Sequence, residues 1–68
     1  MSDVIAQFRA ALYANGKEYD SASIEARNVD DAVRKAKDWV KTIELRKNSS
    51  LEITLDGRHV RTFKHKEL

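Results

Sequence analysis

The candidate metal ligands or bases of this 68-residue chain include its two histidines, His59 and His65. They are six residues apart in the sequence. No Asp or Glu stands at a spacing that would complete a metal-binding set with them. We interpret both as surface histidines, and we expect no metal site.

Other reactive types also lack partners. A nucleophile needs a base within reach and a third group that orients the base. That context is missing around the four serines that lie in predicted turns or strands, namely Ser21, Ser23, Ser49 and Ser50. Gly16 and Gly57 both fall in predicted hairpin turns, so no glycine-rich phosphate loop remains. We therefore expect no catalytic residue and no cofactor, and we predict that the chain is not an enzyme.

Asp30 and Asp31 are adjacent, and adjacent side chains diverge on a helix. We interpret them as first-turn charges that pair with Arg34 and Lys35. Trp39 stands beside an apolar helical stripe, and we expect it to belong to the core rather than to bind a ligand.

The composition excludes several classes of protein. The chain has no Cys, so it has neither a disulfide framework nor Cys-ligated zinc. No apolar run approaches ~20 residues, which a membrane helix needs. The start, Met1-Ser2-Asp3-Val4, lacks the layout of a signal peptide. We expect one cytoplasmic domain over residues 1–68.

Residues 4–14 alternate between apolar and mixed positions, as a half-buried strand does, and Asn15-Gly16 is a turn signal. A two-residue loop would pair Phe8 with Ser23 and put Ile24 on the wrong face. A three-residue loop over 14–16, with Gly16 in the left-handed region, aligns the apolar residues. We choose the second register, with a partner strand over 18–27 and the pairs Val4–Ala26, Ala6–Ile24 and Phe8–Ala22.

A helix is predicted over about 29–46. Asn28 is a good N-cap, and Asp30 and Asp31 place negative charge in the first turn. Asn48 is expected to close the helix in the left-handed conformation. An apolar stripe at helical spacing consists of Val29, Ala32, Val33, Ala36, Val40 and Ile43.

The last segment predicts a second hairpin. Residues 51–55 alternate, Asp56-Gly57 is a two-residue turn signal, and residues 58–64 return as a strand. This loop predicts the pairs Ile53–Val60, Glu52–Arg61 and Thr54–His59. Phe63 then falls on the face opposite Val60, unless a bulge separates them.

The fold class is therefore α+β with the order ββαββ. We expect a four-stranded antiparallel sheet with one helix packed on one face. A right-handed crossover favours strand order 2-1-3-4, and order 2-1-4-3 stays open. The predicted core consists of Phe8, Leu12, Ile24, Val33, Ala36, Val40, Ile53 and Val60.

Association is the leading functional hypothesis, because a small domain with a half-covered sheet gains burial from a partner. We expect a homodimer, or a complex with another protein, through a sheet face bearing Ile5, Ala11, Tyr13 and Tyr19. No membrane partner is expected.

The alternative is a weak, sequence-nonspecific nucleic-acid-binding module. Residues 32–68 carry ten basic and five acidic groups, against three and six in residues 1–31. Basic and aromatic groups on an open sheet can hold phosphates and stack on bases. The candidate contacts lie on the last strand and tail: Arg58, Arg61, Lys64 and Lys66.

One segment bears on the source of the chain. Residues 24–36, IEARNVDDAVRKA, resemble the strand, cap and helix junction of several small bacterial domains. Together with the absence of Cys, this resemblance implies a bacterial cytoplasmic protein.

Overall fold

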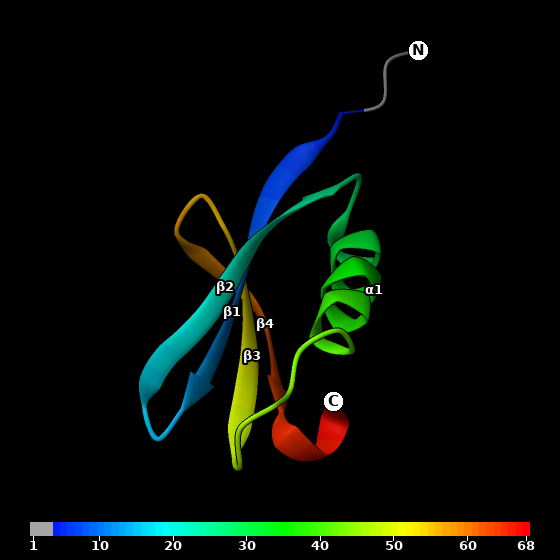
Figure 1. Ribbon diagram of the computed structural model, residues 1–68. Helices are drawn as coiled ribbons and strands as arrows, with labels where there is room; N and C mark the ends of the chain where they lie inside the picture. The colour runs from blue at the N-terminus through cyan, green and yellow to red at the C-terminus, as the bar shows by residue number, and fades with distance from the viewer. Residues whose placement is uncertain (1–3) are drawn as a thin grey trace.

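A computed structural model describes residues 4–68. The elements in chain order are β1 (Ala6–Ala14), β2 (Lys17–Ala26), α1 (Val29–Val40), β3 (Ser49–Leu55), β4 (Arg58–Lys64) and the 3₁₀ turn η1 (His65–Glu67). The strands form one antiparallel sheet in the order β2-β1-β3-β4, and α1 packs on one of its faces (Figure 1). The predicted ββαββ fold and the favoured strand order are confirmed.

The two hairpins are built in the same way. Their turns, Asn15-Gly16 and Asp56-Gly57, hold all four residues at positive φ, between 52° and 78°. Two such residues in succession are typical of the type I′ turn. In each hairpin the third residue after the glycine has no partner across the ladder, which makes Tyr19 and Val60 β-bulges.

The first hairpin corrects the predicted register. Its loop has two residues rather than three, and the bulge at Tyr19 then shifts the pairing by one. Phe8 lies opposite Ile24 and Ala6 opposite Ala26, so the predicted pairs Phe8–Ala22, Ala6–Ile24 and Val4–Ala26 are wrong. The predicted faces of β1 and of residues 20–26 are right, because a displacement by two residues preserves the alternation of a strand. Tyr19, expected on the open face, lies at the bulge and packs against the core instead.

The second hairpin keeps the predicted turn and the pair Thr54–His59. The bulge at Val60 places Arg61 opposite Ile53, and Thr62 opposite Glu52. The predicted pairs Ile53–Val60 and Glu52–Arg61 are therefore wrong. The same bulge resolves the position of Phe63, which lies opposite Leu51 and packs against the core.

A local twofold axis relates the two hairpins. Their turns, at 15–16 and 56–57, are 41 positions apart in the sequence. Ala11 and Glu52 are also 41 positions apart, and they face each other across the antiparallel pair β1–β3. The four-stranded sheet is thus two similar hairpins joined through their first strands.

Helix α1 begins as predicted and ends earlier. Asn28 caps it by accepting a hydrogen bond from the backbone N–H of Asp31 at 2.8 Å. The helix stops at Val40 instead of Arg46. Thr42 donates from both its N–H and its hydroxyl to the carbonyl of Trp39, which ends the regular i to i−4 ladder. Asn48 does adopt positive φ (58°), but in the connection before β3 rather than at the helix end.

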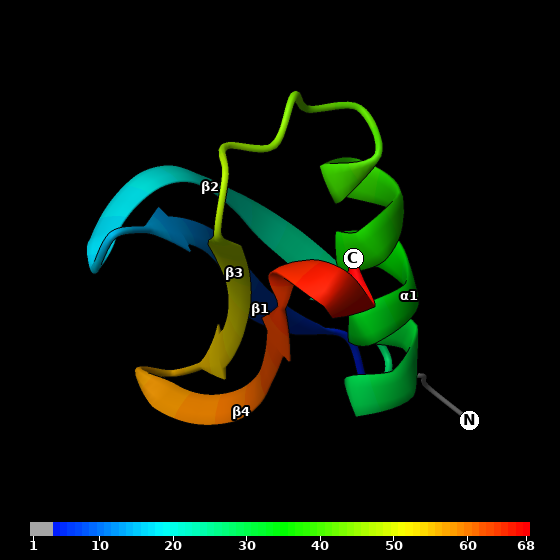
Figure 2. The same cartoon turned by 90° about the horizontal axis from the view of Figure 1, so that it is seen from below.

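The core lies between α1 and the face of the sheet that the helix covers (Figure 2). Val33 and Val60, predicted as core, are only partly buried, whereas Leu51 is fully buried and was not predicted. No helix in residues 4–68 is long and apolar enough to cross a membrane. The buried core residues are Phe8, Ala10, Leu12, Ile24, Ala26, Ala32, Ala36, Val40, Leu51 and Ile53.

Candidate functional site

The face of the sheet that points away from α1 carries mostly polar side chains. Arg9 donates to a carboxylate oxygen of Glu18 at 2.7 Å, and Tyr13 donates to the same oxygen at 3.5 Å. The hydrogen bond and the charge of Glu18 raise the pKa of Arg9. The negative charge of Glu18 on this face is thus neutralised by the adjacent guanidinium of Arg9.

The four residues predicted for self-association do not share one surface. Ile5 precedes β1 and is 58% exposed. Ala11 points to the open face but is 2% exposed, because longer side chains flank it. Tyr13 is partly exposed on that face. Tyr19, at its bulge, packs against the core on the opposite side.

Tyr19 belongs to a closed ring of hydrogen bonds that the sequence pattern did not indicate. The Ser49 hydroxyl donates to the carbonyl of Arg46, the Tyr19 hydroxyl bonds to Ser49 Oγ, and the N–H of Arg46 donates back to the Tyr19 oxygen. Only one proton order satisfies all three contacts, with Tyr19 donating to Ser49. The Arg46 guanidinium lies 4.6 Å from the centre of the Tyr19 ring. This ring fixes the connection between α1 and β3.

The neighbouring end of β4 is fixed by η1. The N–H of Lys64 donates to the carboxylate of Glu67, and the N–H of Ser49 donates to His65 Nδ1 at 3.2 Å. The Nδ1 atom of His65 is therefore the acceptor in this contact. The start of β3 and the end of β4, which lie side by side, are therefore connected through the imidazole of His65.

A hollow of about 530 Å³ opens between the start of β3 and the end of β4. Its wall contains two ammonium groups, one imidazole, two serines and one amide, and no carboxylate. The lining residues are Asn48, Ser49, Ser50, Lys64, His65 and Lys66. Such a wall offers hydrogen-bond donors and positive charge to an anion.

Two of the four predicted nucleic-acid contacts, Lys64 and Lys66, thus meet at one site. The other two lie elsewhere along β4, since Arg58 follows the turn and Arg61 lies opposite Ile53. The sequence reasoning found the cations but missed Asn48 and Ser50, whose residue types carry no distinguishing signal on their own.

A second hollow, of about 420 Å³, is lined by four aliphatic and three charged residues. It lies where the end of α1, the following connection and η1 meet, and its charged rim carries both signs. Its lining residues are Lys37, Val40, Lys41, Ile43, Leu45, Glu67 and Leu68. A rim with both signs does not select for an anion, unlike the wall of the first hollow.

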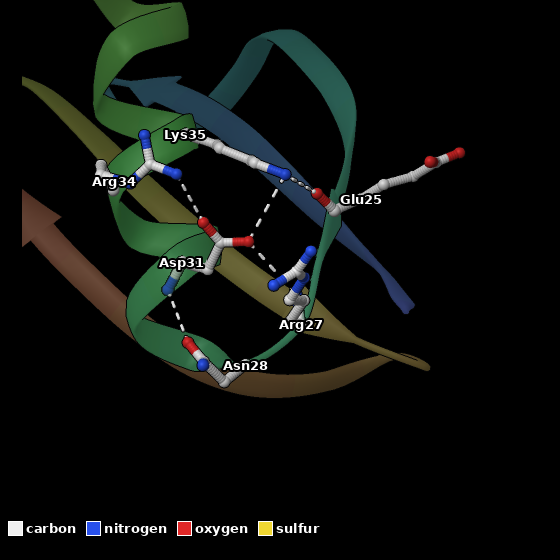
Figure 3. A network of polar contacts seen from close by, with 6 residues as sticks. All are labelled: Glu25, Arg27, Asn28, Asp31, Arg34 and Lys35. Carbon is white, nitrogen blue, oxygen red and sulfur yellow. Dashed lines mark hydrogen bonds and ion pairs between the residues drawn. The ribbon is translucent and has the colours of Figure 1, made fainter. Parts of the chain in front are cut away.

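The start of α1 carries a polar network centred on Asp31 (Figure 3). Its carboxylate accepts from Arg34 at 2.7 Å and from the N–H of Arg27 at 3.3 Å, and it pairs with Lys35 at 3.4 Å. The hydrogen bond from Arg34 contributes most to lowering the pKa of Asp31. Lys35 also donates to the carbonyl of Glu25, so the network joins β2 to the helix. The predicted i,i+4 pair of Asp31 with Lys35 is confirmed, whereas Arg34, expected four residues after Asp30, pairs with Asp31 at a spacing of three.

In residues 4–68, no three His, Cys, Asp or Glu side chains lie close enough to hold a metal ion. Comparison with known proteins finds no matching family model and no significant match among curated proteins or solved structures.

Proposed function

We propose that the protein is a small non-enzymatic module that acts by association, and that it forms a homodimer through the edge of its N-terminal segment. The observation that carries this proposal is the exposure of two large apolar side chains there. Val4 is 79% exposed and Ile5 is 58% exposed. Other large apolar residues among 4–68 are buried or partly buried.

The backbone of this segment also has an open edge. The pairing of β1 with β3 begins at Phe8, opposite Leu55, where β3 ends. Ala6 and Gln7 are paired with β2 on one side only. Unpaired N–H and C=O groups on such an edge can accept another strand.

The outer edges of the sheet are less suited to pairing. Both β2 and β4 are interrupted by a bulge, and both carry several charged side chains. Bulges and charges are the usual means by which proteins prevent strands from adding to an edge. Residues 4–7, Val-Ile-Ala-Gln, carry no charge.

A second copy is the partner that this edge fits best. Two identical strands pair antiparallel about a twofold axis, and each copy then offers the same segment to the other. An axis between Ile5 and Ala6 would set Val4 opposite Gln7 of the second copy. So short a contact buries less than a standard interface, and we expect weak association, in the micromolar range or above.

Sedimentation of the parent chain from micromolar to near-millimolar concentration tests the proposal. We expect the mass to rise from one chain toward two, and Ile5→Lys to keep it at one chain. The control is Ser21→Lys, which adds the same charge at an exposed position of β2 and should still dimerise.

Far-ultraviolet circular dichroism verifies that each variant is folded. A parent chain that stays monomeric throughout would overturn the proposal, as would an Ile5→Lys variant that dimerises like the parent. The setting we propose is the bacterial cytoplasm, since a chain without Cys needs no oxidising compartment to fold.

A further inference from the structure

The open face of the sheet ends in a row of side chains that crosses three strands. Tyr13 of β1 lies opposite Ser50 of β3, and Ser50 lies opposite Lys64 of β4. Neighbouring strands are about 4.8 Å apart, so the row measures about 10 Å from Tyr13 to Lys64. An aromatic ring, a hydroxyl and an ammonium group therefore stand side by side on one surface.

The hollow extends this row beyond the edge of the sheet. Ser50 and Lys64 belong to its wall, and Lys66, His65 and Asn48 complete it. Its lining residues carry two ammonium groups and no carboxylate, which favours a polyanion. The nearest carboxylate, that of Glu67, already accepts a hydrogen bond from the N–H of Lys64. Glu18, on the other side of Tyr13, is paired with Arg9 at 2.7 Å and so opposes an anion only weakly.

We infer that this surface binds single-stranded nucleic acid. An unpaired base stacks on Tyr13, and the adjoining backbone phosphates contact Lys64 and Lys66 in the hollow. Stacking on an aromatic side chain is nearly indifferent to base identity, and lysines contact phosphates without reading sequence. The binding is therefore weak and nonspecific in sequence. It uses a surface separate from the N-terminal edge and does not depend on the dimer.

The pairing of an aromatic ring with lysines distinguishes a single strand from other polyanions. In a duplex the bases are stacked on each other, and their faces are not available to Tyr13. A sulfated polysaccharide presents charge without any aromatic face. Both should therefore bind through the lysines alone.

The structure around the hollow is held in place before any ligand arrives. Ser49 is 2% exposed and is bonded to Tyr19, Arg46 and His65, so the start of β3 cannot easily move away from η1. A preformed site loses less conformational entropy on binding than a flexible one.

Fluorescence anisotropy with a labelled mixed-sequence DNA decamer at low salt tests the inference. The decamer is used single-stranded, annealed to its complement, and in competition with heparin. We expect the single strand to bind more tightly than the duplex. With two phosphate contacts, log affinity should fall with log salt at a slope of about −1.4 for the single strand.

Variants locate the site. Lys64→Ala should flatten the salt slope by about 0.7, and Tyr13→Leu should weaken single-strand binding about tenfold while leaving duplex binding unchanged. Arg58→Ala is the matched control, because it removes one positive charge from the same strand, away from the hollow. It should leave the single-strand affinity within about twofold of the parent.

Three results would overturn the inference. The first is the absence of binding at tens of micromolar protein. The second is an equal loss of affinity in Arg58→Ala and Lys64→Ala, which would mean a diffuse charge effect. The third is an unchanged affinity in Tyr13→Leu, which would reduce the site to a general polyanion contact. Circular dichroism confirms that Tyr13→Leu is folded, and amide chemical shifts of residues 48–50 and 64–66 in the parent give a second readout of the same contact.

Discussion

At the residue scale, hydrogen bonds of Tyr19 and Ser49 fix the connection between α1 and β3. Ser49 is buried, and its hydroxyl and amide both have partners within the protein. Among the described residues, no buried side-chain nitrogen or oxygen lacks a hydrogen bond. Since an unsatisfied buried polar group costs about 1–3 kcal/mol, this closed arrangement stabilises the connection that forms one wall of the hollow.

Asp31 gives a prediction about pH. Its pKa is lowered in the folded protein, mainly by the hydrogen bond from Arg34, so the folded state favours the charged carboxylate. The resulting stability is present above the ordinary pKa of Asp, near 4, and is lost as pH falls through the lowered value. Urea midpoints measured from pH 6 to pH 2 should therefore fall less steeply for Asp31→Asn than for the parent. Parallel pH profiles for the two proteins would contradict this account of Asp31.

The two hairpins show, at the scale of elements, how a turn and a bulge together set a register. The positions of both turns, Asn15-Gly16 and Asp56-Gly57, were predicted from residue types, because few residues tolerate two consecutive positive φ values, but the first was expected as a three-residue loop. The bulges were not predicted, except as the stated condition for Phe63. A bulge is stabilised by tertiary contacts of the bulged side chain. The side chains of Tyr19 and Val60 both pack against the core.

Gly16 gives a prediction about the first turn. It has φ of 76°, and nothing lies within 4 Å of the position that a Cβ would occupy. The cost of Gly16→Ala is therefore conformational rather than steric, about 1 kcal/mol for an L-residue in the left-handed region. Gly16→Asn should cost less, because Asn tolerates this region better. Urea denaturation of both variants checks the order, and equal stability of Gly16→Ala and the parent would contradict it.

The early end of α1 could also not be predicted from the periodicity of its apolar residues. Periodicity extends the apolar stripe to Ile43, and Ile43 does pack against the core. Ile43 lies in the connection after the helix. The helix has ended before it, because Thr42 donates two hydrogen bonds to the carbonyl of Trp39. An apolar side chain can therefore pack against the core from a helix or from the loop that follows it. The spacing of apolar residues in the sequence does not distinguish these two cases.

Ile53 tests the packing of the whole molecule. It lies fully buried on the central strand β3, and Ile53→Ala should destabilise the fold by about 2–5 kcal/mol through lost burial and a residual cavity. Leu55→Ala on the same strand is the matched control, because Leu55 is only partly buried. Its loss should be clearly smaller in the same urea titration. Equal losses would mean that the core is not centred where the sheet and helix meet.

The amino-acid sequence by itself determined the order of elements, the positions of both turns, the helix cap and the buried faces of β1, β3 and most of β2. These features depend on residues close in the chain: the alternation of apolar side chains, the φ preferences of Asn, Asp and Gly, and the capping of a helix by Asn28. For the same reason the cations of the candidate site could be listed but not placed.

Only the tertiary structure decided which of those residues meet. The bulges place Tyr19 on the helix side and bring Thr62, rather than Arg61, opposite Glu52. The pairing of β1 with β3 brings Tyr13 beside Ser50 and Lys64, and η1 adds Lys66 and His65. The pairing of Tyr13 with Ser50 joins segments more than thirty residues apart, and the contacts among β3, β4 and η1 depend on the bulge at Val60, so neither follows from local preferences.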